Sequence, residues 1–223
     1  MEGKLDKRKR IVHTEPASPI AEQFRTIRAN IDFLTVGMPC KVILVTSPEA
    51  GTGKSTVSSN LAISYAQQGK KTLLIDIDMR KPTIHKTFNK PLFRGGLSGV
   101  LRKQLDILDA CQDTEVENLT VLTSGTLPPN PNELLGSKRM AEIIAELREE
   151  FEQIIVDAPP VTIVSDALVV APETDGIILV FRTGKTLKDG AKAAYEQLAL
   201  SRTQVLGVVL NGVDEAHHYY SAY

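Results

Sequence analysis

The chain has no tryptophan, only two cysteines and almost no net charge. Cys40 and Cys111 lie far apart without metal-ligand spacing, which suits two free thiols in a reducing compartment. Twenty-six basic and 27 acidic side chains leave a net charge of −1, so no overall field marks a nucleic-acid-binding protein. No apolar run reaches the ~18 residues of a membrane span, and no N-terminal signal region is present. We therefore expect one cytoplasmic domain without a nucleic-acid partner.

The most informative segment is a glycine-rich loop between an apolar strand and a helix. In this order the glycines let backbone N–H groups point at phosphate oxygens, and the helix N-terminus adds its positive dipole end. In such a P-loop Lys54 reaches the β- and γ-phosphates and the Ser55 hydroxyl ligates Mg²⁺. The alternative is an ordinary glycine turn before a helix. We predict a nucleoside triphosphate site made by Gly51, Thr52, Gly53, Lys54, Ser55 and Thr56.

One residue departs from the strict P-loop pattern, in which a glycine opens the loop. Pro48 occupies that position, and proline fixes φ and lacks an N–H. The loop is therefore a variant that the chain enters differently from the loop of a Ras-like GTPase.

Strands and helices alternate along the chain, which predicts an α/β P-loop NTPase fold with a doubly wound, mostly parallel sheet flanked by helices. Most candidate strands are continuous apolar runs, as expected of parallel strands buried on both faces. We expect a flexible basic tail over residues 1–19, a P-loop domain over 20–213 and a mobile tyrosine-rich tail over 214–223. The candidate strands are 41–46, 72–77, 119–124, 153–157, 176–181 and 205–210; the candidate helices are 20–34, 54–68, 98–101, 137–151, 165–170 and 187–200.

Carboxylates at the ends of two apolar strands complete the predicted site. Asp76 and Asp78 end one strand two residues apart, so their side chains share one side of an extended chain. Asp157 ends another strand, which is the Walker B arrangement for holding the metal or its waters. Asp residues are also common where strands turn, but three of them beside a P-loop favour a metal site. We predict an Mg-ATP site in which Ser55, Asp76 and Asp157 serve as the metal-binding set.

Arg80 and Lys81 follow the aspartate pair directly. We expect these two cations to neutralise phosphate charge during transfer, with Arg80 as the catalytic residue. The alternative is that both residues are surface charges beside the turn that Pro82 ends.

Three motifs together resemble the bacterial tyrosine kinases, or BY-kinases. The resemblance spans roughly residues 14–223 and is to the separate kinase of Gram-positive capsule or exopolysaccharide operons. It implies ATP-dependent autophosphorylation on tyrosine, in which Lys54 and the three aspartates are catalytic. One of Asp76 and Asp78 would accept the proton of the tyrosine, whose pKa of about 10 calls for a nearby base. The motifs are residues 46–56, 76–82 and 156–160, with further matches at 124–125, 128–135, the Glu22-x-x-Arg25-x-x-Arg28 stripe and the terminal tyrosines.

Three of the five tyrosines occupy the last five positions of the chain. A tail of this kind has no core to join and can reach an active site. The resemblance makes Tyr219, Tyr220 and Tyr223 the phosphoacceptors. The alternative is an adhesive, disordered end without a chemical role.

The resemblance also assigns roles at two other positions. It makes the stripe of Glu22, Arg25 and Arg28 a subunit contact in an octamer-like homo-oligomeric ring, where a neighbour's tail enters the active site in trans. The alternative is a set of intrahelical i,i+3 ion pairs. Asn211 follows the last strand, where nucleotide-binding relatives contact adenine.

The partners implied by the resemblance are a membrane adaptor or activator of the polysaccharide co-polymerase type, protein substrates such as sugar-nucleotide enzymes, and a phosphotyrosine phosphatase. The adaptor would recruit the cytoplasmic kinase to the inner face of the cell membrane. There the kinase would regulate the synthesis and export of capsular polysaccharide or exopolysaccharide.

Two other functions remain open from the sequence. A positioning ATPase of the division-site or partition type shares this fold, but those proteins carry a signature lysine where this chain has Glu49. A non-catalytic regulator that uses nucleotide binding to gate a polysaccharide machine is the second alternative, which sequence separates poorly from a kinase.

Overall fold

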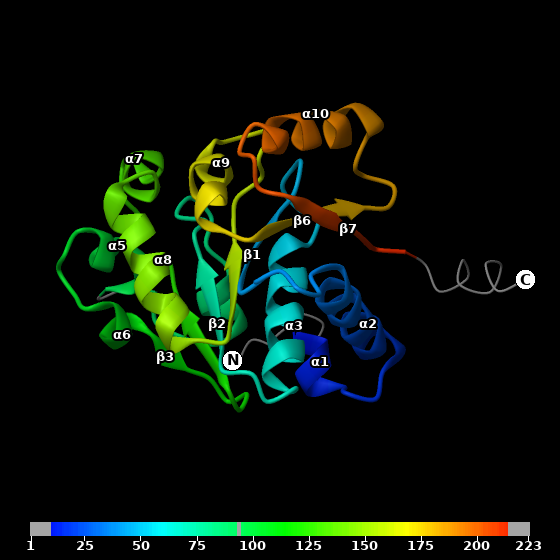
Figure 1. Ribbon diagram of the computed structural model, residues 1–223, viewed down its shortest axis with the longest axis horizontal. Helices are drawn as coiled ribbons and strands as arrows, with labels where there is room; N and C mark the ends of the chain where they lie inside the picture. Colours follow the sequence, from blue (N-terminus) through cyan, green and yellow to red (C-terminus); the bar gives the residue numbers. More distant parts are fainter. Residues whose placement is uncertain (1–9, 93–94, 214–223) are drawn as a thin grey trace, which may run out of the picture.

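The computed structural model describes residues 10–92 and 95–213, and these form a seven-stranded sheet in the order β3-β4-β2-β5-β1-β6-β7 (Figure 1). Every neighbouring pair is parallel except β3 and β4. The predicted doubly wound, mostly parallel P-loop fold is therefore confirmed. The strands are β1 Val42–Thr46, β2 Thr72–Asp76, β3 Gln112–Asp113, β4 Leu119–Leu122, β5 Gln153–Asp157, β6 Gly176–Arg182 and β7 Val205–Asn211.

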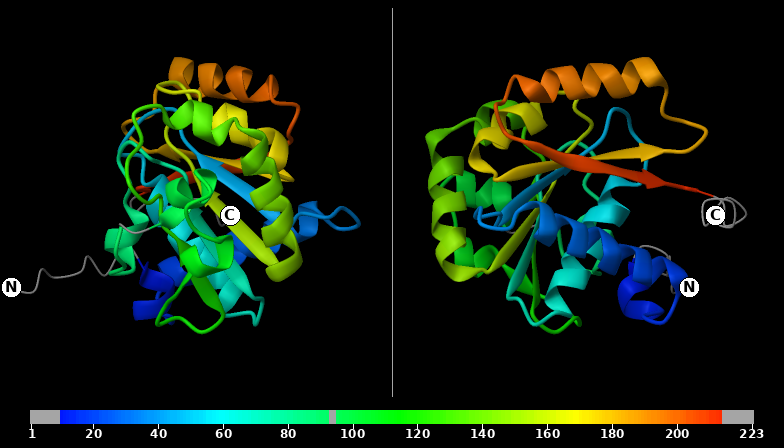
Figure 2. Two further views of the ribbon diagram at one scale, coloured as in Figure 1. Left: turned by 90° about the vertical axis from the view of Figure 1, so that its left-hand side faces the viewer. Right: turned by 45° about the vertical axis from the view of Figure 1, so that its right-hand side comes forward.

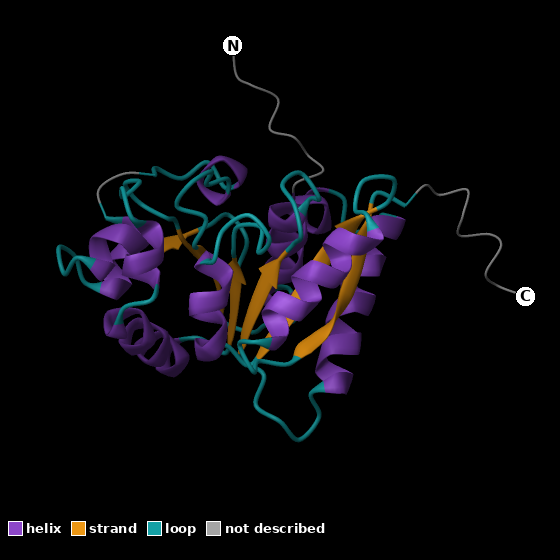
Figure 3. Cartoon of the chain, turned by 90° about the horizontal axis from the view of Figure 1, so that it is seen from above, coloured by secondary structure: helices purple, strands orange, loops and turns teal. Residues whose placement is uncertain are grey.

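The central strands are buried because they are apolar along their whole length. All five residues of β1, β2 and β5 are buried, so both faces of these strands pack against helices. The register pairs Asp76 at the end of β2 with Asp157 at the end of β5. The parallel arrangement thus brings the two predicted acidic motifs to one edge of the sheet, where the loops gather (Figure 3).

Helices cover the sheet on two faces, and each face has its own apolar core. One core contains side chains from α5 to α10, and the other contains side chains from α1 to α4. In each case an apolar helix stripe faces the sheet, as in α8, where Met140, Ile143 and Leu147 are buried. The helices are α1 Ile11–Thr14, α2 Pro19–Leu34, α3 Lys54–Ala66, α4 Ile84–Thr87, α5 Gly96–Leu101, α6 Ile107–Ala110, α7 Pro131–Leu135, α8 Lys138–Glu150, α9 Asp166–Val170 and α10 Lys188–Ala199, with a 3₁₀ turn at Ala171–Glu173.

The N-terminal part of the chain is more ordered than the predicted tail over residues 1–19. Residues 11–14 form α1, and Ile11 and Val12 are buried in the apolar core that contains side chains of α2 and α3. The backbone of Val12 exchanges hydrogen bonds with Asn60 and Gln67 of the α3 region. The boundary at residue 19 is therefore wrong, because two apolar side chains bind the segment to the core. Residues 1–9 lie outside the described part of the chain.

The last strand differs from the expectation of strands buried on both faces. Among the described strands β7 has only β6 as a neighbour, and its Val208 and Leu210 side chains are 53% and 57% exposed. Helix α10 lies over β6 and β7 (Figures 1 and 2), but it leaves these side chains uncovered. An apolar run therefore forms a partly exposed edge strand here. Among the described residues, no helix combines the length and apolar character that crossing a membrane requires.

Candidate active site

The glycine-rich loop joins β1 to α3, as the sequence predicts, and two of its glycines have left-handed backbone angles. Gly51 has φ of 78° and Gly53 has φ of 94°. A Cβ atom on Gly53 would also overlap the Nδ2 atom of Asn211. Both the backbone angle and the crowding therefore require glycine at position 53. Helix α3 begins at Lys54, so its N-terminus faces the loop.

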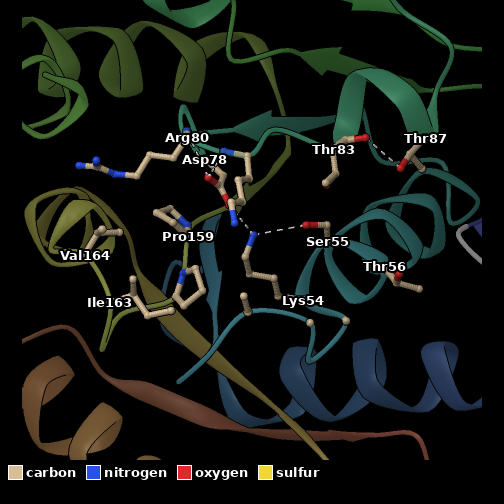
Figure 4. Close-up of a pocket in the computed structure, with 15 residues that line it drawn as sticks. Lys54, Ser55, Thr56, Asp78, Arg80, Thr83, Thr87, Pro159, Ile163 and Val164 are labelled. Carbon is tan, nitrogen blue, oxygen red and sulfur yellow. Dashed lines mark hydrogen bonds and ion pairs between the residues drawn. The ribbon is translucent and has the colours of Figure 1, made fainter. Parts of the chain in front are cut away.

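The side chain of Lys54 lies among the predicted carboxylates at the edge of the sheet. Its Nζ atom is 3.2 Å from Asp78 Oδ2 and 3.7 Å from Asp157 Oδ2. The same Nζ lies 3.4 Å from the Ser55 hydroxyl (Figure 4). The fold thus brings together the lysine of the P-loop and the ends of two strands that are separated by about 80 residues. The carboxylates of Asp78 and Asp157 thus hold the ammonium group that a P-loop uses to bind phosphate oxygens.

The two aspartates after β2 have different environments. Both carboxylate oxygens of Asp76 are engaged by backbone N–H groups: Asp78 N donates to Oδ1 at 3.0 Å, and Thr83 N and Ile84 N each donate to Oδ2 at 3.1 Å. Asp76 is completely buried and fixes the turn that leads into α4. The Oδ1 atom of Asp78 accepts hydrogen bonds from Arg80 N at 3.3 Å and Lys81 N at 2.9 Å, but its Oδ2 is directed at Lys54 and the residue lines a cavity. Of the pair, Asp78 is therefore the carboxylate that faces the cavity.

Asp157 is buried and has one oxygen without a hydrogen bond. Its Oδ1 accepts a hydrogen bond from Ser58 at 2.9 Å, whereas Oδ2 has no hydrogen-bond donor in the described structure and faces the ammonium of Lys54. A buried carboxylate oxygen in this situation is costly unless a cation or a donor reaches it. Lys54 is therefore the group that compensates this oxygen, and a metal ion could take over that role if phosphate drew Lys54 away.

The carboxylates and Lys54 shift one another's proton affinity. Burial and the charge of Asp157 raise the pKa of Asp76 to about 8. Burial also raises the pKa of Asp157, although Lys54 opposes that shift. For Lys54 itself, burial acts to lower the pKa, but the charges of Asp157, Asp78 and Asp76 outweigh it and the pKa is raised. Without a nucleotide the site has more carboxylates than cations, so it favours binding a proton or a metal ion.

The donor set fits a divalent metal that is held jointly with a nucleotide. No group of three or more His, Cys, Asp or Glu in the described residues forms a ready-made metal cage. Mg²⁺ is usually bound by one or two carboxylates together with water and phosphate oxygens, so a full cage is not required. The orphan oxygen of Asp157 and the nearby hydroxyl of Ser55 are suitable ligands. Ser55 and Asp157 of the predicted metal set are therefore chemically suitable, whereas backbone N–H groups already occupy both oxygens of Asp76, whose metal role stays a prediction.

A cavity of about 380 Å³ opens beside these residues. One wall is apolar and comes from the segment after β5, including Pro159, Ile163 and Val164 (Figure 4). The opposite wall carries Thr83 and Thr87, while Lys54 and Asp78 lie between the two walls. The cavity can therefore accept a group that is partly apolar and brings a polar atom to Asp78.

Arg80 is paired with a buried carboxylate that sequence reasoning missed. Its Nε and Nη2 atoms donate to Asp166 at 3.1 and 3.3 Å, and the Asp166 side chain is completely buried at the start of α9. Asn132 adds a third donor to Asp166 at 3.4 Å. Arg80 still lines the cavity, so it is neither a free surface charge nor a free phosphate ligand. The only sequence signal for Asp166 was an acidic residue in the first turn of a helix after the Walker B strand.

Comparison with known proteins identifies the family. Residues 40–205 match a family model described as an AAA domain. The chain is 44% identical over 216 residues to tyrosine-protein kinase YwqD of Bacillus subtilis, covering 97% of this chain and 91% of that protein. It is 42% identical to putative tyrosine-protein kinase CapB of Staphylococcus aureus, covering 95% and 93%. The crystal structure of the chimerical protein CapA2B2 superposes with a TM-score of 0.89 at 42% identity, covering 93% of this chain and 91% of that one.

The chain belongs to the bacterial tyrosine kinase family. The predicted enzyme class, a protein-tyrosine kinase built on a nucleotide-binding P-loop fold, is thereby confirmed. The septum site-determining protein MinD of Pyrococcus horikoshii is more distant, with a TM-score of 0.66 at 23% identity. That likeness shows only that the BY-kinase and the positioning ATPase share a fold.

Asn211 of this BY-kinase contacts the P-loop. Its Nδ2 donates to the carbonyl of Thr52 at 2.8 Å. The predicted adenine contact stays a prediction, and the observed role is to hold the loop from the end of β7. Asn211 does reach the nucleotide-binding loop from a point 159 residues away in the sequence.

The three residues of the predicted ring contact have partners within this chain. Arg25 pairs with Glu22 at 2.6 Å and also donates to the carbonyl of Pro16. Arg28 Nη1 donates to the carbonyl and the hydroxyl of Ser64 at 2.7 and 3.2 Å, which joins α2 to α3. The intrahelical ion pair expected as the alternative therefore exists for Glu22 and Arg25, while the ring contact stays a prediction. Tyr219, Tyr220 and Tyr223 lie outside the described residues.

Proposed function

We propose that this chain is an ATP-dependent kinase that phosphorylates tyrosines in the C-terminal cluster of a neighbouring copy. The observation that carries the proposal is the position of Asp78, which contacts Lys54 on one side and faces the partly apolar cavity on the other. A phenol entering that cavity would have an apolar wall for its ring and a carboxylate for its hydroxyl proton. Tyr219, Tyr220 and Tyr223 are the proposed acceptors.

The roles within the site follow from the contacts of each side chain. Phosphates of ATP would draw Lys54 from Asp78 and Asp157, and they would leave Asp78 free to accept the tyrosine proton. Ser55, Asp76 and Asp157 would hold Mg²⁺ or its waters. When bound, Mg²⁺ supplies positive charge that neutralises the phosphate oxygens during transfer. Arg80, held by Asp166, would add a second positive charge at the edge of the cavity.

The proposed assembly is a homo-oligomeric ring in which the tail of one copy reaches the site of the next. Glu22 and Arg25 lie on the solvent side of α2 and are the better candidates for the contact, since Arg28 is committed to Ser64. A membrane adaptor would recruit the ring to the inner face of the membrane and activate it. There the kinase would regulate capsular or exopolysaccharide synthesis and export. Its substrates would include sugar-nucleotide enzymes, and a phosphotyrosine phosphatase would remove the phosphate groups.

The test is incubation of the full chain with Mg-ATP, with and without the cytoplasmic segment of an adaptor, followed by phosphotyrosine mapping by mass spectrometry. We expect phosphate on the terminal tyrosines, and we expect it to disappear in Lys54→Met. Lys188→Met, an exposed lysine at the start of α10, is the matched control and should behave as wild type. ATP hydrolysis with unmodified tyrosines in both mixtures would overturn the kinase proposal in favour of a positioning ATPase.

A further inference from the structure

The outer part of the P-loop is held by side chains from distant segments of the chain. Residues 49–52 each accept one hydrogen bond from the end of β6, the β6–α10 turn or the end of β7. None of the donor residues belongs to the P-loop or to the acidic motifs. The contacts are Thr186 Oγ1 to Glu49 Oε1 at 2.6 Å, Lys185 Nζ to Ala50 O at 2.6 Å, Arg182 Nη1 to Gly51 O at 3.3 Å and Asn211 Nδ2 to Thr52 O at 2.8 Å.

The turn that supplies three of these donors is itself internally bonded. The backbone N–H groups of Lys185 and Thr186 donate to the carbonyl of Arg182 at 3.1 and 2.9 Å. The Thr186 hydroxyl accepts a hydrogen bond from Arg182 N at 3.0 Å and donates its own proton to Glu49. Thr183 N donates to Asn211 O at 2.9 Å, which joins the turn to the end of β7. Thr186 is therefore the point where a preformed turn is connected to the P-loop.

Glu49 is suited to this contact by charge as well as by geometry. Its carboxylate lies beside the first turn of α10, where a Cβ atom on Gly190 would be 3.9 Å from Oε2. The N-terminus of this 12-residue helix is its positive end, which stabilises a nearby carboxylate. A lysine at position 49 would face that positive end and the cations of Arg182 and Lys185. It would also lack an acceptor for the hydroxyl of Thr186.

We propose that Glu49 and Thr186 are positioning residues for nucleotide binding, and that they hold the P-loop in its phosphate-binding shape before the nucleotide arrives. Neither residue needs to touch phosphate for this role. The N–H groups of the loop bind phosphate best when their directions are already fixed, because ordering them upon binding would cost conformational entropy. The positioning ATPases have their signature lysine at this position. In this chain Glu49 occupies it and holds the loop through Thr186, while the positive charges nearby disfavour a lysine there. This role affects nucleotide affinity, whichever residue accepts the phosphate.

The test is a double-mutant cycle on the affinity for a fluorescent ADP analogue in the presence of Mg²⁺, measured with the full chain. Glu49→Ala and Thr186→Val should each raise the Kd about tenfold, since each removes a hydrogen bond to a charged group. The effects of the two single variants should combine to less than their product in the double variant, because both variants remove the contact between Glu49 and Thr186. Glu49→Lys should raise the Kd further than Glu49→Ala. In the kinase assay the KM for ATP should rise more than kcat falls.

Conservative variants separate positioning from a general loss of structure. Thr186→Ser keeps the hydroxyl and Glu49→Gln keeps an acceptor oxygen, so both should stay within about threefold of the wild-type Kd. Thr183→Val is the matched control, because its hydroxyl has no hydrogen bond among the residues that the structure describes. The proposal is overturned if Thr186→Val binds as tightly as wild type, if Thr186→Ser is as weak as Thr186→Val, or if the effects of the two single variants multiply.

Discussion

Arg80 and Asp166 form a two-point ion pair across the edge of the active site, with Nε to Oδ2 at 3.1 Å and Nη2 to Oδ1 at 3.3 Å. The two partners are not equivalent, because the Asp166 side chain is completely buried while that of Arg80 is 43% exposed. Asp166 therefore depends on Arg80 for charge compensation, and Arg80 depends on Asp166 for its direction.

This asymmetry predicts opposite effects of two substitutions on stability. Arg80→Ala leaves a buried carboxylate with only the weak donor of Asn132, so we expect a loss of about 1–3 kcal/mol in the free energy of unfolding. Adding Asp166→Asn to that variant should restore most of the loss, since the unpaired charge is then gone. Urea denaturation measures both changes. Equal stability of Arg80→Ala and the double variant would contradict the dependence inferred here.

The same pair predicts a loss of catalysis without loss of nucleotide binding. Asp166→Asn keeps the size of the side chain but weakens its hold on Arg80, so kcat for tyrosine phosphorylation should fall about tenfold while the Kd for ADP stays unchanged. Asp109→Asn, at an exposed aspartate in α6, is the matched control. A normal kcat in Asp166→Asn would exclude a positioned Arg80 from phosphoryl transfer.

Substitutions of the two aspartates after β2 should differ in their effects on stability and on catalysis. Asp76 accepts three backbone N–H groups, so Asp76→Asn places an amide NH₂ or a weaker acceptor against these donors and should lower stability by about 1–3 kcal/mol. Asp78 accepts two backbone N–H groups on one oxygen only, so Asp78→Asn should lower stability less, and it should reduce kcat at least 100-fold through loss of the proposed base. Thermal unfolding and phosphotyrosine formation are the two measurements. Strong tyrosine phosphorylation by Asp78→Asn would assign the base elsewhere.

The raised pKa of Asp76 predicts how stability depends on pH without nucleotide. Its pKa of about 8 in the folded state lies above the value of about 4 that an unfolded aspartate has, so folding takes up a proton between these values. The contribution of Asp76 is therefore greatest below pH 4 and is lost as the pH rises through about 8. The Tm of wild type minus that of Asp76→Asn should fall between pH 5 and pH 8. A difference that stays constant over this range would contradict the shift.

The N-terminal helix offers a test that separates assembly from folding. Arg28→Ala removes two hydrogen bonds to Ser64 and should lower the stability of the single chain by about 1 kcal/mol. The double variant Glu22→Ala/Arg25→Ala breaks an exposed pair of small energetic value, so the chain should stay folded but lose the proposed ring. Light scattering reports the mass of the assembly and thermal unfolding reports the fold. A double variant that keeps the wild-type mass would remove Glu22 and Arg25 from the subunit contact.

The architecture and the position of the P-loop beside the strand-end aspartates could be predicted from the amino-acid pattern alone. Apolar runs that end in Asp76 and Asp157 predict buried parallel strands, and parallel strands place their carboxyl ends at one edge of the sheet. The loop from Gly51 to Thr56 predicts a phosphate site because its glycines and the following helix are local features. These inferences needed only chain periodicity and neighbours in sequence, and the structure places the residues accordingly.

The side chains that these residues contact are set by the packing of the folded chain. It joined Arg80 to Asp166, Glu49 to Thr186, Arg28 to Ser64 and Asn211 to Thr52. It also distinguished Asp76, which fixes a turn, from Asp78, which faces the cavity, although the two are equivalent in an extended strand. The physical reason is that each of these contacts joins segments whose approach depends on how helices pack on the sheet. Periodicity gives the face on which a side chain lies, but the hydrogen bonds it makes depend on the neighbours that packing brings to it.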